Sequence, residues 1–307
     1  MTDDRVKARE RKAILRPLVE GFLGRADVAG VIPTPLDQLN QHLALNPVQR
    51  LFDPDDMPPG LNESIARLRS KILGAFSWPE RSIYLSAGLT AGQSKFTHAH
   101  ELGHAVIPWH EQAYFSDDLF TLAPETRQEL EAEANCFASE LIFQSRDFLE
   151  RSTSAALGLQ TAIDLAGYYD TSIHSTVRHY VEENRYSCGL IVFGRYPDRS
   201  GGLVRPKVRA TVESTRFERG HGRLEDCLPL DLSGGVLPLA GDVMRVLQGQ
   251  VIDTVTRGDC ALTTFRGVTL MRYEVFFNQY SVFALIYPKK SVRLRTTVPK
   301  PTEALTA

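Results

Sequence analysis

The sequence of 307 residues has few of the features that mark membrane or secreted proteins. Its longest apolar runs fall far short of the ~20 residues that cross a bilayer, so we expect no membrane span. The opening segment MTDDRVKARERKAILRPL is charged and lacks the apolar stretch of a secretory signal. The 4 cysteines lie far apart and form no Cys-x-x-Cys pair, which argues against a disulfide framework. We therefore expect a cytoplasmic protein.

An excess of charge of either sign is also missing. Lys and Arg number 35 and Asp and Glu 37, which gives a formal net charge of -2. This balance argues against a strongly basic nucleic-acid binder. The hydrophobic fraction of 43% and the charged fraction of 23% are ordinary values for a globular protein. A chain of this length buries a full core without disulfides and suggests two domains of about 150 residues each.

Hydrophobic periodicity divides the sequence into a helical first half and a β-rich second half. Apolar residues at helical spacing predict a helix over 125–143, with Leu130, Ala134 and Leu141 on its buried stripe. After residue 184 the period shifts toward two and β-branched residues increase, which predicts strands. We therefore predict an α+β fold. Its predicted parts are an α-rich domain at 1–150, a helical module at 151–185, a β-rich domain at 186–298 and a flexible tail at 299–307.

Shorter elements follow from local patterns. A hairpin is predicted from strands at 73–77 and 82–86, joined by a turn that contains Pro79. A helical stretch is predicted over 96–107, ending at Pro108, and the segment 109–124 is predicted to be irregular.

The segment His100-Glu101-Leu102-Gly103-His104 is the most informative part of the sequence, because it has the pattern HExxH within a predicted helix. Positions i and i+4 lie on one face of a helix, so both imidazoles can reach one Zn²⁺ at about 2.1 Å. Glu101 lies about 100° around the helix, where it can take a proton from a metal-bound water. The alternative is a surface helix with incidental histidines. The apolar flanking residues argue against it, because they favour a partly buried helix.

A catalytic zinc site has three protein ligands and leaves its fourth position to water. The predicted helix at 125–143 supplies Glu131, with Glu133 as the alternative. Glu131 and Asn135 are four residues apart and share a face. Asn135 is therefore a candidate to hydrogen-bond a ligating histidine from outside the metal shell. Without the preceding HExxH segment, these glutamates would be interpreted as a solvated helix face.

The segments FTHAHELGHAVI and ELEAEANCFASELIF resemble the two motifs of the ImmA/IrrE family of metallo-endopeptidases. The resemblance covers about residues 30–183. It implies a zincin-like metallopeptidase core with His100, His104 and Glu131 as zinc ligands and Glu101 as general base. Manganese is the alternative metal.

The sequence departs from the family motifs at two places. His98 replaces an apolar residue, and we expect it in the core or next to a ligand. Phe143-Gln144 replaces the Met-Pro that ends the second helix, so the path of the chain beyond this helix is open. Nearby, we expect Trp109-His110 to supply packing and a surface histidine, and Cys136 to be a small buried hydrophobe rather than a redox sensor.

Residues 165–178 have the pattern of a helix-turn-helix, with Ser172 capping the second helix. That helix offers few basic groups for phosphate contacts, which argues against direct DNA binding and favours a scaffold or docking role. The resemblance implies such a module after the peptidase core, followed by a GAF-like sensor domain. The resemblance of the last domain to a GAF domain rests on the composition and order of its predicted strands. The alternative is a domain that binds the substrate.

The resemblance also implies a substrate class. Members of the family characteristically cleave a helix-turn-helix transcriptional repressor and so switch on stress, mobile-element or phage genes. In gluzincin-like folds an edge strand equivalent to 82–86 binds the extended substrate. Two alternatives stay open, a DNA-binding regulator with a structural metal and a non-proteolytic antirepressor. An intact Glu101 argues against the antirepressor, because sequestration needs no base.

Overall fold

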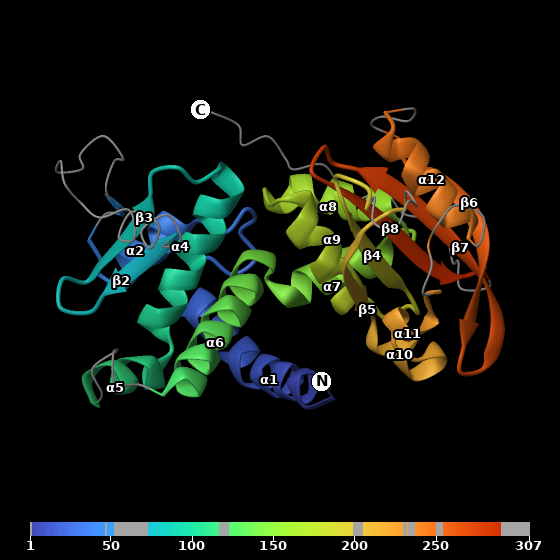
Figure 1. Ribbon diagram of the computed structural model, residues 1–307. Helices are drawn as coiled ribbons and strands as arrows, with labels where there is room; N and C mark the ends of the chain where they lie inside the picture. Colours follow the sequence, from blue (N-terminus) through green and yellow to red (C-terminus); the bar gives the residue numbers. More distant parts are fainter. Residues whose placement is uncertain are drawn as a thin grey trace. The chain divides into compact units, whose positions relative to one another are not determined.

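The computed structural model describes residues 2–46, 48–51, 73–116, 123–198, 205–229, 232, 237–249 and 254–289. The chain has an α+β fold, in which a helical core precedes an antiparallel sheet (Figure 1). It divides into two compact units, Met1–Phe148 and Leu149–Ala307. The tail predicted at 299–307 lies outside the described residues.

The first unit combines helices with a small mixed sheet (Figure 1). In this sheet β3 lies between β1 and β2, parallel to the first and antiparallel to the second. The predicted hairpin is confirmed, but the expectation that strand 82–86 lies at the edge is wrong. Among the described strands, β3 is central and β2 is an edge. The elements of this unit are α1 (Thr2–Arg25), α2 (Leu36–His42), β1 (Gln49–Leu51), β2 (Gly74–Ser77), β3 (Ser82–Ser86), α4 (Ala91–Val106), α5 (Pro108–Ser116) and α6 (Pro124–Phe143).

Two helix boundaries differ from the sequence prediction. Helix α4 begins at Ala91 because Thr90 and Gln93 form a capping box, in which each side chain satisfies the backbone N–H of the other. Helix α5 occupies residues 109–116 of the segment 109–124, for which the sequence pattern predicts irregular structure, and residues 117–122 lie outside the described residues. Pro108 is its first residue, where a missing N–H costs no helical hydrogen bond, so this proline separates two helices and does not open a loop.

Helix α1 packs on α6 in the core of the first unit. Leu15, Val19 and Phe22 are buried and recur at helical spacing along one face. On the same helix, Arg16 makes a two-point ion pair with Glu140 of α6, at 2.9 and 3.1 Å. Only 1% of the Glu140 side chain is exposed. Helix α6 is therefore held to α1 by apolar packing and by a partly buried ion pair.

The second unit contains a five-stranded antiparallel sheet in the order β5-β4-β8-β7-β6. Helix α12 packs on β6, β7 and β8, whereas α9 packs on β4 and β5. Cover on both faces explains why seven of the eight residues of β8 are buried, in the continuous run SVFALIY. The elements after α6 are α7 (Ser145–Ser154), α8 (Leu159–Tyr169), α9 (Ile173–Glu182), β4 (Gly189–Gly194), β5 (Val208–Glu213), α10 (Thr215–His221), α11 (Leu224–Cys227), α12 (Pro238–Leu247), β6 (Thr256–Thr264), β7 (Gly267–Phe277) and β8 (Ser281–Pro288).

The helices with the helix-turn-helix pattern, α8 and α9, belong to the same unit as the sheet. Ser172 caps α9 as the sequence predicts, by accepting a hydrogen bond from the backbone N–H of Ser175. Helix α8 is fixed to the sheet by Glu274 of β7, which is 3% exposed and accepts a hydrogen bond from the N–H of Leu159 at 2.6 Å. The sheet therefore caps α8 from outside the helix.

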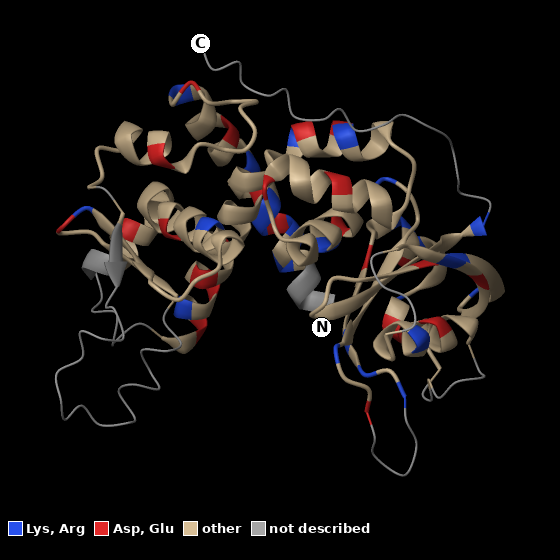
Figure 2. Ribbon diagram, turned by 90° about the horizontal axis from the view of Figure 1, so that it is seen from above, with Lys and Arg blue, Asp and Glu red and all other residues tan. Residues whose placement is uncertain are grey.

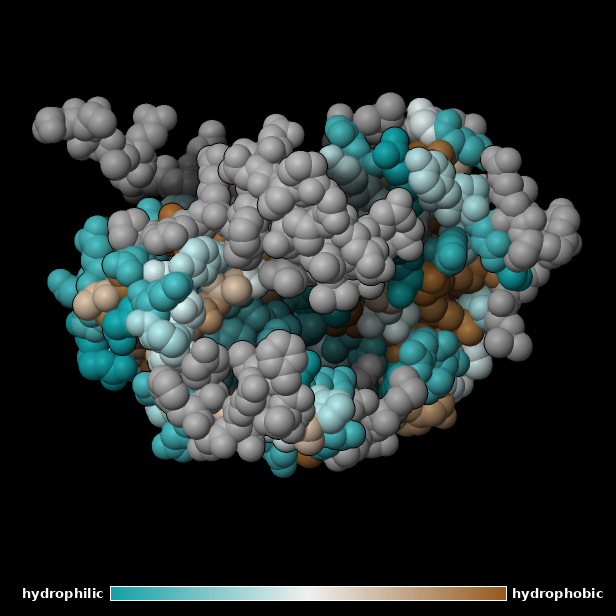
Figure 3. Space-filling view, turned by 60° about the vertical axis from the view of Figure 1, so that its left-hand side comes forward, coloured by the Kyte–Doolittle hydropathy of each residue, from teal (hydrophilic) through white to brown (hydrophobic). Residues whose placement is uncertain are grey.

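Figure 2 shows basic and acidic residues interspersed over the helices and strands. In the view of Figure 3, hydrophilic residues cover most of the described surface. Each helix among the described residues is too short or too polar to cross a membrane.

Candidate metal centre

Close packing of α4 against α6 forms the floor of the candidate site. Ala99 is fully buried, and a Cβ atom on Gly103 would lie 3.2–3.3 Å from Phe137 and from the Cα atom of Ala134. Small residues on α4 therefore let the backbones of the two helices approach closely. This approach brings the middle of α6, where Glu131 lies, beside the HExxH face of α4.

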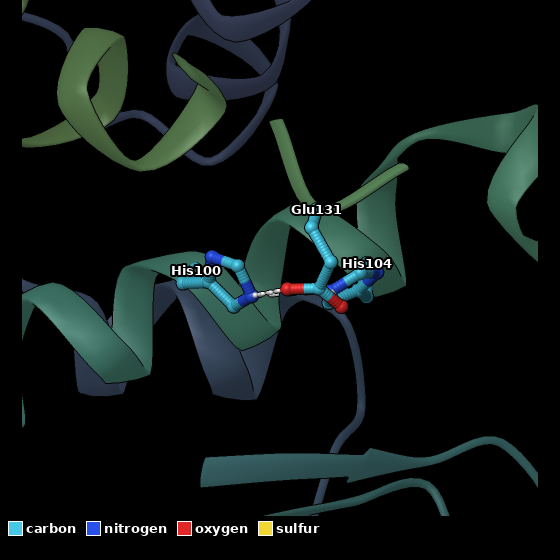
Figure 4. Close-up of side chains that lie close together, drawn as sticks. All are labelled: His100, His104 and Glu131. Atoms are coloured by element: carbon cyan, nitrogen blue, oxygen red, sulfur yellow. Dashed lines mark hydrogen bonds and ion pairs between the residues drawn. The ribbon is translucent and has the colours of Figure 1, made fainter. Parts of the chain in front are cut away.

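His100 and His104 of α4 point to the Glu131 carboxylate, as Figure 4 shows. The Nε2 atom of His100 lies 3.2 Å from Oε2 of Glu131, and the Nε2 atom of His104 lies 3.7 Å from Oε1. The two Nε2 atoms are 3.2 Å apart. Ligands about 2.1 Å from a tetrahedral ion lie about 3.4 Å from one another, so this spacing suits Zn²⁺. Among the described residues, these three form the group that could hold a metal ion.

Glu101 lies on α4 beside this group and is 5% exposed. Its carboxylate is close to the backbone of β2, because a Cβ atom on Gly74 would lie only 2.8 Å from Oε1 of Glu101. Burial raises the pKa of Glu101 to about 7, which the charge of Glu131 supports and that of His100 opposes. The carboxyl group is thus suited to accept and return a proton near neutral pH.

The two histidines have different protonation behaviour. Burial lowers the pKa of His100, but the hydrogen bond to Glu131 and the nearby carboxylates outweigh it, so the net pKa is raised. Burial and the neighbouring His100 and His110 lower the pKa of His104. A histidine binds metal as the neutral imidazole, so metal binding here would require His100 to lose the proton that its raised pKa favours.

Each of the two histidines also has a partner for its second ring nitrogen. The Nδ1 atom of His100 lies 3.1 Å from Oδ1 of Asn135, the contact predicted for Asn135 from its spacing. The Nδ1 atom of His104 lies 3.0 Å from Nδ1 of His110. His110 is 3% exposed, so the expectation of a surface histidine is wrong. No local sequence pattern indicates this contact. A proline usually ends a helix, so Pro108 does not indicate from sequence that α5 begins there.

Other residues considered near the motif take no part in the group. His98 is 6% exposed and its Nε2 atom lies 3.0 Å from Oδ1 of Asn40 on α2. Burial lowers the pKa of His98 to about 4, so it is a neutral histidine of the core, as expected. Burial raises the pKa of Cys136 to about 11, which leaves little reactive thiolate at neutral pH.

Comparison with known proteins agrees with this geometry. The family model of the IrrE N-terminal-like domain, in peptidase family M78, matches residues 61–175, which include the two histidines and Glu131. The match supports the resemblance of this part of the chain to the ImmA/IrrE family of metallopeptidases. The family is metal-dependent, in agreement with the group formed by α4 and α6.

The fold extends beyond the matched domain. A solved structure described as a Mycobacterium tuberculosis transcriptional regulator is similar over 92% of this chain and 80% of its own chain, with 14% identity and a TM-score of 0.50. At this identity the likeness concerns the fold alone. A search of curated proteins found no match.

Proposed function

We propose that the chain is a zinc-dependent endopeptidase that cleaves a helix-turn-helix transcriptional repressor. The observation that carries the proposal is the convergence of three metal-binding side chains, from two helices, beside the buried carboxyl group of Glu101. His100, His104 and Glu131 would hold the ion, and Glu101 would serve as general base and acid.

The metal ligands and Glu101 would have different roles in peptide hydrolysis. A bound zinc ion supplies Lewis acidity that makes water a stronger acid and polarises the scissile carbonyl group. Glu101 accepts a proton from the attacking water and donates it to the leaving amine nitrogen as the C–N bond breaks.

The number of ligands favours catalysis over a structural metal. A structural zinc site is closed by four protein ligands, whereas a catalytic site has three and an open position. In the part of the chain that the structure describes, the metal-binding group has three members. The alternative of a DNA-binding regulator with a structural metal is further weakened by α9, because half of its residues, His179 among them, are buried and few basic side chains are left to contact DNA.

Strand β2 is the place where an extended peptide would bind. It is an edge among the described strands, and Gly74 lies against the Glu101 side chain. A peptide added to this edge would gain backbone hydrogen bonds and would lie close to the general base. The proposed substrate, a transcriptional repressor, follows from the family resemblance. The role of the structural neighbour as a transcriptional regulator agrees with it.

A cleavage assay tests the proposal. Zinc-loaded protein is mixed with the helix-turn-helix repressor encoded nearest to its gene, and products are measured by intact mass. We expect one new cut, abolished by a chelator and by Glu101→Gln, whereas Glu129→Gln on the exposed part of α6 leaves it intact. Cleavage by Glu101→Gln at the wild-type rate would rule out the assigned base.

The same assay separates the antirepressor alternative. An antirepressor binds the repressor without cutting it, and Glu101→Gln would leave that binding unchanged. Repressor that is bound but uncut by wild-type protein with stoichiometric zinc would favour sequestration. The role of the second unit, as a GAF-like sensor or a grip on the substrate, stays a prediction.

A further inference from the structure

We propose that His110 and Glu133 are positioning residues for the metal centre. They form a hydrogen-bonded relay that fixes the tautomer and the ring orientation in which the Nε2 atom of His104 binds the metal. The inference rests on the proposed function, because it takes His104 as a ligand. It adds two residues that lie outside the group of three and come from different helices, α5 and α6.

The atoms of the relay allow one proton arrangement. His104 directs Nε2 toward His100 and Glu131, so metal binding requires the lone pair on Nε2 and the proton on Nδ1. This Nδ1–H donates to Nδ1 of His110 at 3.0 Å. His110 then carries its own proton on Nε2 and donates it to Oε2 of Glu133 at 2.9 Å.

The surroundings of the relay hold it in place. The side chain of His110 is 2% exposed and that of Glu133 is 17% exposed, so water competes little for these hydrogen bonds. Trp109 donates from Nε1 to the same Oε2 atom of Glu133 at 2.6 Å. Two donors therefore fix one carboxylate oxygen, and the start of α5 supplies both of them.

The relay makes the two histidine ligands unequal. His100 donates to the neutral amide of Asn135, whereas His104 is linked through His110 to a carboxylate. A carboxylate behind a ligating imidazole raises its basicity and fixes its orientation, and loss of such a partner typically weakens metal binding about 10- to 100-fold. We therefore expect His110 and Glu133 to contribute to zinc affinity and not only to packing.

The test measures zinc binding to the full chain by competition with a chromophoric chelator, so that it needs no substrate. We expect His110→Phe to weaken zinc binding about 10- to 100-fold. His110→Gln, which keeps an acceptor and a donor, should restore most of the affinity. Glu133→Gln keeps the shape of the side chain and should weaken binding by several-fold, whereas Glu129→Gln on the same helix should have no effect. The visible spectrum of the Co²⁺-loaded protein should change with His110→Phe and not with Glu129→Gln.

Different results overturn different claims. If His110→Phe and Glu133→Gln are folded and bind zinc like the wild type, the relay has no positioning role and His110 only fills space. If His110→Phe does not fold, the comparison of Glu133→Gln with Glu129→Gln decides the question, and equal zinc affinity refutes the relay. If the wild-type protein itself binds no zinc, the proposed function fails, not the relay alone.

Discussion

The buried ion pair between α1 and α6 gives a prediction that the structure supports in detail. Arg16→Met would leave the Glu140 carboxylate, 1% exposed, without the guanidinium group that now binds both its oxygens. Loss of one partner of a fully buried pair costs about 3–5 kcal/mol. The Arg16 side chain is 34% exposed, so water would reach the carboxylate in part. We therefore expect the free energy of unfolding of the first unit to fall by about 2–3 kcal/mol.

The same helix supplies a matched control. Arg11 pairs with Glu129 at 2.8 Å, but the Glu129 side chain is 48% exposed. Pairs of this kind contribute about 0–1 kcal/mol, so Arg11→Met should have a smaller effect. Replacing both charges of the buried pair, with Arg16→Met and Glu140→Leu together, should recover most of the loss because no unpaired charge remains.

Urea denaturation followed by tryptophan fluorescence measures these losses of stability for the first unit of the chain. The chain has 2 tryptophans, Trp78 and Trp109, and both lie in Met1–Phe148. Their fluorescence therefore reports unfolding of the first unit without a signal from the second. Equal losses of stability for Arg16→Met and Arg11→Met would refute the argument from burial.

Three further predictions concern the site and the second unit. Gly74→Ala would place a Cβ atom 2.8 Å from Oε1 of Glu101 and closer still to Cγ2 of Thr97, so the side chains of α4 must shift. We expect kcat for repressor cleavage to fall on the order of 100-fold while zinc affinity, measured by chelator competition, stays unchanged. Glu131→Ala should weaken zinc binding in the same competition. The loss should exceed the about 10- to 100-fold expected for a residue that contacts only a ligand, and unchanged affinity would contradict the assignment of Glu131 as a ligand. Glu274→Gln removes the charge that caps Leu159 at the start of α8 and that pairs with Arg257, and it should destabilise the second unit by about 1–2 kcal/mol, measured by circular dichroism in urea. An unchanged urea midpoint would show that this cap contributes little.

The individual helices and strands can largely be predicted from the sequence. Helical spacing of apolar residues predicts α6 to within one residue at its start, and alternation with turn residues predicts the β2–β3 hairpin. The HExxH spacing by itself places His100 and His104 on one face of a helix. These features depend on neighbours within a turn of helix or a pair of strands, so a short stretch of sequence carries them.

Packing between distant segments is decided by the tertiary structure. Nothing in the sequence around Trp109-His110 shows that His110 is buried against His104, because its burial depends on the direction that α5 takes after Pro108 and on its contact with α6. The position of β3 between two strands likewise depends on β1, a partner more than thirty residues earlier in the chain. Sequence patterns identify the groups that carry the chemistry. The partners that orient them come from other helices and strands, and only the fold determines which side chains these are.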